Sequence, residues 1–118
     1  MNCYLMYIAD GANFRGVLEP VMISAVREVY NVRSGDMIGS CFEWEFDCEG
    51  DSTIGRIQPD FETITLSGSG PAGIKMAFEI QNLCDTPFRI TDGNYSFDFL
   101  ISKFSTFDEL KIKTFNSR

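Results

Sequence analysis

The chain of 118 residues contains no histidine, and this absence removes the commonest general base of enzymes. It also removes every catalytic pairing of a serine or cysteine with histidine. The four cysteines form no C-x-x-C pair, and a zinc site would need further ligands at suitable spacing. We therefore expect a protein that is not an enzyme and that holds no metal or cofactor.

Basic residues are scarce as well. Ten Lys and Arg stand against 17 Asp and Glu, which leaves a net charge of −7. A field of this sign repels nucleic acid, attracts basic proteins or cations, and speeds association with them. A nucleic-acid partner is therefore not expected, whereas a basic protein partner is.

Sequence signals for export or membrane insertion are missing. The apolar segment at residues 1–9 lacks a basic region and runs directly into Asp10 and Gly11. It is also too short to cross a bilayer. Since there are no repeats, linkers or low-complexity tracts, we expect a single cytoplasmic domain over residues 1–118 with no membrane partner.

The most informative segment that is present spans residues 41–51, in which acidic and apolar side chains alternate. The carboxylates form what we call the acidic row: Glu43, Glu45, Asp47, Glu49 and Asp51. Because successive side chains of a strand point to opposite faces, the pattern predicts a strand that buries Phe42, Trp44 and Phe46 and displays the acids. Seven acids and one base lie between residues 41 and 62, so this segment carries −6 of the net charge of −7.

The acidic row is a candidate surface for a basic partner. Carboxylates two residues apart on a strand lie about 6.7 Å from each other and repel by only about 0.6 kcal/mol in water, so the row is tolerable when solvated and is favoured when a cation covers it. A calcium-binding loop does not fit, because Ser52 stands where that loop needs glycine. The candidate binding residues are Glu43, Glu45, Asp47, Glu49, Asp51, Asp60 and Glu62. The alternative is an ordinary solvated face whose acids keep the sheet soluble.

The periodicity of apolar residues predicts alternating strands and helices. The expected strands are residues 3–9, 41–51, 52–57, 61–67, 88–91 and 95–101, the last two joined by a turn at 92–94. The expected helices are residues 18–30 and 71–83, with Ser69 as a candidate N-cap of the second. Tyr95 shares strand parity with Phe97 and Phe99, which indicates a core position.

A third helix at residues 105–114 is left open. Ser105 and Asp108 form a variant of the capping box, whereas residues 110–114 alternate as a strand does. The order β-α-β-β-(β)-α-β-β predicts an α+β fold: a mainly antiparallel sheet with two helices, or three if this segment is helical, packed on one face.

Glycines at residues 68, 70 and 73 spell G-x-G-x-x-G between an expected strand and an expected helix, the context of a dinucleotide-binding loop. The preceding strand alternates, Pro71 removes a backbone amide, and only 45 residues follow Gly73, so a plain loop is the better interpretation. A ferredoxin-like regulatory module with a small-molecule ligand at Gly68–Gly73 remains the alternative function.

Three short segments are similar to those of a known family. They are Ala9-Asp10-Gly11 after the first strand, Leu66-Ser67-Gly68-Ser69-Gly70 before the second long helix, and Tyr95-Ser96-Phe97-Asp98 after it. With the order of elements, they resemble bacterial toxin-immunity proteins of contact-dependent growth inhibition systems. The resemblance implies a protein that binds and neutralises a cognate toxin domain, often a nuclease. It transfers no contact residue to this chain.

Overall fold

The computed structural model describes residues 3–9, 23–24, 26–58, 63–84 and 86–117. The strands are β1 (Cys3–Ile8), β2 (Val32–Ile38), β3 (Cys41–Cys48), β4 (Asp51–Ile57), β5 (Thr63–Ser67), β6 (Phe88–Asp92) and β7 (Asp98–Leu100). The helices are α2 (Pro71–Leu83), the short 3-10 helix η2 (Ile101–Lys103) and α3 (Phe107–Asn116). Residues 23–24 and 26–28 are also helical, within the helix that the sequence predicts at 18–30.

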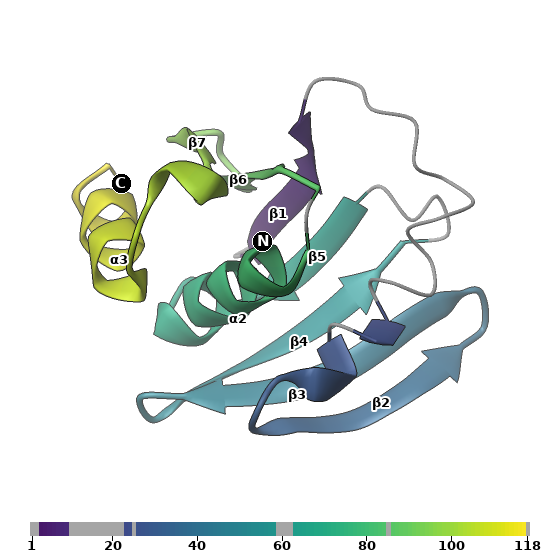
Figure 1. Ribbon diagram of the computed structural model, residues 1–118. Coiled ribbons are helices and arrows are strands. Elements are labelled where there is room, and N and C mark those ends of the chain that lie inside the picture. Colours follow the sequence, from purple (N-terminus) through teal and green to yellow (C-terminus); the bar gives the residue numbers. More distant parts are fainter. Residues whose placement is uncertain (1–2, 10–22, 25, 59–62, 85, 118) are drawn as a thin grey trace.

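The seven strands form one sheet in the order β2-β3-β4-β5-β1-β6-β7, and every neighbouring pair is antiparallel (Figure 1). Strand β1 therefore lies between β5 and β6, whereas β2 and β7 are the two edges. The expected α+β architecture with a mainly antiparallel sheet is confirmed.

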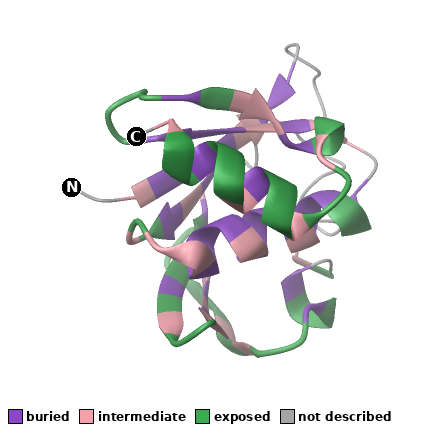
Figure 2. Ribbon diagram, turned by 90° about the vertical axis from the view of Figure 1, so that its left-hand side faces the viewer, coloured by how far each residue is buried: buried purple, intermediate pink, exposed green. Residues whose placement is uncertain are grey.

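The sheet has an apolar face and a polar face. The inner face carries Tyr4, Phe42 and Trp44, and α2 packs on it against β1, β3 and β4. Helix α3 packs in turn on α2 and is mostly exposed, whereas α2 is mostly buried (Figure 2). The side chains at the intervening positions of the strands lie on the outer face, and none of the described helices covers it.

Helix α2 has the bounds that the sequence predicts, Pro71–Leu83, and it buries Ile74, Ala77, Phe78 and Ile80 as expected. Its N-cap is Gly70 and not Ser69, and the cap residue contributes no side-chain hydrogen bond. The side chain that caps the helix comes instead from strand β4, where Asp51 Oδ2 accepts a hydrogen bond from the amide of Ala72 at 3.1 Å. The predicted N-cap was therefore wrong.

Two further differences concern the edges of the fold. Strand β2 was not predicted, because a bulge between Arg33 and Asp36 breaks its alternation. Tyr95 is 75% exposed with φ +55°, so the core position predicted for it was wrong. The chain is still turning at Tyr95, and strand parity holds only from Asp98, where β7 begins.

The segment at residues 105–114, left open by the sequence, forms the cap and first eight residues of α3 (Phe107–Asn116) and no strand. The capping box is formed by Thr106 and Glu109, one residue later than the variant with Ser105 and Asp108 that the sequence indicates. Two other predicted elements extend beyond the described residues, since residues 18–22 and 25 of the first helix and residues 61–62 of one strand lie outside them. Within the described ranges, no helix is both long and apolar enough to span a bilayer.

Candidate functional site

Strand β3 positions the candidate site, and its alternation is as predicted. Phe42 and Trp44 are fully buried on the inner face, while Glu43, Glu45 and Asp47 are half-buried on the outer face. The indole of Trp44 lies over Gly55 of β4, where an added Cβ would come within 2.2 Å of the ring. The aromatic side chains thus pack β3 into the core, and the acids lie on the opposite face of the sheet.

The chain itself supplies cations to these three acids. Arg56, opposite Glu43 on β4, donates Nη2 to Glu43 Oε2 at 2.7 Å. Arg33 on β2 contacts two acids at once, with Nη1 at 3.0 Å from Glu45 Oε2 and Nη2 at 2.8 Å from both carboxylate oxygens of Asp47. The acids therefore belong to a cross-strand ion network on the outer face.

The network shifts the pKa of two of its members, Asp47 and Arg56. The Ser52 hydroxyl, which donates to Asp47 Oδ1 at 2.7 Å, lowers the pKa of Asp47, and Arg33 lowers it further. The hydrogen bond and charge of Glu43 raise the pKa of Arg56. Apart from Glu43, whose side chain is 26% exposed, these side chains are about half exposed, so solvent screens the ion pairs and each contributes little to stability.

The outer face keeps an excess of negative charge after this pairing. Asp36 of β2 lies opposite Glu43 and makes no ion pair with any residue of the described ranges. Three carboxylates (Glu43, Glu45 and Asp47) pair with two guanidinium groups (Arg33 and Arg56). Together with Asp36, this leaves two net negative charges on this part of the face.

Glu49 and Asp51 do not continue the displayed row, and the prediction that one strand carries all five acids was wrong. The chain reverses in a hairpin turn at Glu49 and Gly50, both with positive φ, and β4 begins at Asp51. Glu49 lies 3.1 Å from Lys111 Nζ of α3. Asp51 points to the start of α2. Of the other predicted residues, Asp60 and Glu62 lie outside the described part of the chain.

Sequence reasoning missed Arg33 and Lys111 as partners of the acids. Arg33 reaches the row only because β2 pairs with β3, and a usable signal was present: Gly39 and Ser40 form a turn between the ends of these two strands. Lys111 comes from a helix 62 positions further along the chain, and no local pattern connects it to Glu49.

The glycine-rich loop before α2 has a packing role. An added Cβ at Gly73 would come within 2.6 Å of the Tyr4 ring, and one at Gly70 within 2.3 Å of Asp51 Oδ2. The Tyr4 hydroxyl donates to the carbonyl oxygen of Ser69 at 2.7 Å. Since Asp51 already places a carboxylate at the α2 N-terminus, where a phosphate would bind, an anionic ligand would have to displace it.

A cleft of about 390 Å³ lies on the helix side, between residues 29–31, β3 and α2. Val29, Phe46 and Cys48 make its apolar lining, and the Lys75–Glu79 ion pair, 2.8 Å long, stands beside them. Burial raises the pKa of the Cys48 thiol, so this cysteine is a weak nucleophile at neutral pH. Across the described residues, no three His, Cys, Asp or Glu side chains are grouped to hold a metal ion.

No family model, curated protein or solved structure matches this chain. Among the described residues, the outer face around β3 is the surface with the most distinctive arrangement of charges. Its carboxylates are held in fixed positions, and the described helices leave it open to a partner (Figure 1).

Proposed function

We propose that the protein is a bacterial immunity protein that binds a cognate toxin domain in the cytoplasm and neutralises it. The observation that supports the proposal is the open outer face of the sheet, on which Glu43, Glu45 and Asp47 stand side by side along β3. The toxin domain is of the nuclease type, with a basic cleft that normally holds phosphates. The resemblance to immunity proteins of contact-dependent growth inhibition systems favours the same partner.

The geometry suits such a partner because the acids are ordered before binding. Arg33 holds Glu45 and Asp47, and Arg56 holds Glu43, so little side-chain freedom is lost when a cleft closes over them. Glu45 and Asp47 nevertheless keep 45% and 48% of their side chains exposed, which leaves carboxylate surface for a second cation. The remaining negative charge would steer a basic domain toward the face.

The test needs a candidate toxin domain, which is sought among the genes that neighbour the one for this protein, and it measures the affinity of that domain by isothermal titration calorimetry. The test variant, Glu43→Gln/Glu45→Gln/Asp47→Asn, removes three charges from the outer face and keeps the side-chain shapes. We expect its dissociation constant to rise by about 100-fold or more, since removing one member of a buried interfacial charge pair costs about 2–5 kcal/mol.

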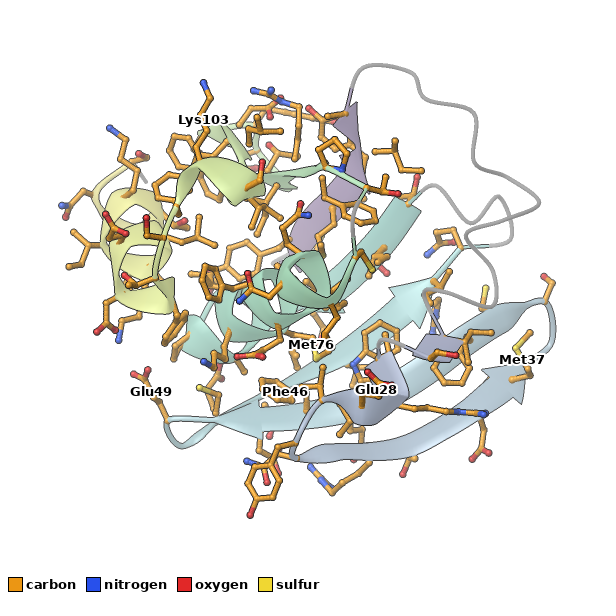
Figure 3. The ribbon with its side chains drawn as sticks, in the orientation of Figure 1. Glu28, Met37, Phe46, Glu49, Met76 and Lys103 are labelled. Carbon is orange, nitrogen blue, oxygen red and sulfur yellow. The ribbon has the colours of Figure 1, made fainter. Side chains whose placement is uncertain are left out.

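A matched control removes three charges from the helix side. Glu28→Gln/Glu79→Gln/Asp108→Asn changes the net charge equally, at positions away from the outer face (Glu28 is labelled in Figure 3). The control should change affinity by only a few fold through long-range steering. Equal affinities of the outer-face variant and the wild type, with both folded by circular dichroism, would reject the proposed interface.

The alternative small-molecule module has less support. Its ligand would bind at Gly68–Gly73, where the N-terminus of α2 already receives the Asp51 carboxylate and where glycines accommodate Tyr4 and Asp51. A protein-binding function requires none of these contacts to change.

A further inference from the structure

Strand β2 is an open edge of the sheet. It is first in the strand order and pairs only with β3. No other described element lies along its free edge (Figure 1). Of eight exposed large hydrophobic side chains among the described residues, three lie on or beside it: Tyr30, Met37 and Ile38, at 86%, 50% and 59% exposure. Met37 is seen at this margin of the sheet in Figure 3.

The sequence of β2 is complementary to itself when a second copy runs antiparallel to it. With a two-fold axis between Ser34 and Gly35, Arg33 of one copy lies opposite Asp36 of the other. Val32 then lies opposite Met37, so apolar side chains meet on the inner face as well. A shift of the register by one or two residues would lose both matches.

The bulge in β2 favours a second copy over an unrelated strand. Because of the bulge, Arg33 and Asp36 point to the same outer face although three positions separate them, as their pairing with Glu45 and Glu43 shows. A straight partner strand could not follow this irregularity, and edge bulges commonly prevent pairing for that reason. In a symmetric pair the two bulges face each other, with Ser34 opposite Gly35, which are the smallest side chains of the strand.

The charged residues of β2 also favour a second copy of the chain as its partner. Asp36 makes no ion pair within the described ranges, and the Arg33 side chain keeps 52% of its surface exposed while it contacts Glu45 and Asp47. β2 contains no lysine or proline, the residues that often protect sheet edges. We propose that two copies of the chain associate through their β2 edges, so that the two seven-stranded sheets become continuous.

Sedimentation velocity of the full chain, over roughly 1 μM to 1 mM protein, tests the proposal in the affinity range of short, transient interfaces. We expect the mass to rise with concentration from 13.3 kDa toward twice that value. Asp36→Arg places two arginines opposite each other in each half of the interface and should weaken association at least tenfold. Asp108→Arg, on exposed α3, makes the same change of charge elsewhere and should associate as the wild type does.

Mixing two variants tests whether residue 33 of one copy lies opposite residue 36 of the other. Arg33→Asp alone places two aspartates opposite each other in each half of the interface and should also associate at least tenfold more weakly than the wild type. Its mixture with Asp36→Arg restores two opposite-charge pairs and should form a heterodimer. Circular dichroism checks the fold of each variant, and Met37→Lys replaces any variant that fails to fold. A wild-type protein that stays monomeric at the highest concentration overturns the proposal, and so does an Asp36→Arg variant that associates like the wild type. Neither result bears on toxin binding.

Discussion

At the scale of the residue, Asp47 shows how neighbouring strands control one carboxylate. Ser52 of β4 donates its hydroxyl to Asp47, and Arg33 of β2 contacts the same group from the other side. Both interactions favour the charged form, so the pKa in the folded protein lies below the ordinary value of 3.8. Their contribution to stability is therefore complete above that ordinary value and is lost as the pH falls through the lower, folded-state pKa.

We predict that Ser52→Ala raises the pKa of Asp47 toward 3.8, because the hydroxyl is the largest cause of its shift. Carboxyl-carbon NMR during an acid titration measures this value directly. The unfolding free energy of the variant should also fall less between the folded-state pKa and 3.8 than that of the wild type. Ser40→Ala, in the exposed β2–β3 turn, should leave the pKa of Asp47 unchanged. An identical pKa in Ser52→Ala and wild type would contradict the assignment.

At the scale of the element, α3 shows how capping decides between two local patterns. Residues 110–114 alternate as a strand does, yet the segment is helical because Thr106 and Glu109 close both sides of a capping box. The amide of Glu109 donates to Thr106 Oγ1 at 3.2 Å, and the amide of Thr106 donates back to Glu109 Oε1 at 3.1 Å. Leu110 and Thr114 then fall on one face of the helix and are buried.

The second prediction concerns this cap. Thr106→Ala should lower the free energy of unfolding by about 1 kcal/mol, within the usual range of about 0.5–2 kcal/mol for a lost N-cap. Urea denaturation monitored by far-UV circular dichroism measures the loss. The adjacent Ser105→Ala is the matched control, because Ser105 contributes its backbone amide to Glu109 and not its hydroxyl. A loss as large in Ser105→Ala would mean that the cap assignment is wrong.

At the scale of the whole molecule, one hydrophobic core unites elements from both halves of the chain. It joins Tyr4 of β1 and Trp44 of β3 with Ile90 of β6 and Leu110 of α3. Trp44 is the single tryptophan and is 0% exposed, so its fluorescence reports directly on this core. Far-UV circular dichroism reports on the helices and strands of the whole chain.

We therefore predict that the two signals follow one unfolding transition. Trp44 emission should shift to longer wavelength with the same urea midpoint and the same slope as the loss of circular dichroism, as expected for one cooperative domain. Two transitions with separate midpoints would show instead that the chain unfolds in independent parts and would contradict a single domain.

Local patterns predicted much of this architecture. The bounds of α2 and the strand character of β1, β3 and β4 follow from periodicity within short segments of the chain, although the turn between β3 and β4 was not predicted. The predictions failed where long-range contacts decide: the cap of α2 comes from Asp51 on β4, and β2 is irregular because of its bulge. The position of Tyr95 also depends on where β7 begins, which local parity does not indicate.

The sequence alone determined that β3 buries its aromatics and displays Glu43, Glu45 and Asp47, because alternation on a strand has a fixed period of two. Only the tertiary structure decided what surrounds those acids. Strand pairing brings Arg33 and Arg56 against them, and the hairpin turn removes Glu49 and Asp51 from the row. Electrostatic interactions act through space, so the charge of this face depends on which strands are neighbours in the sheet and not on which residues are neighbours in the chain.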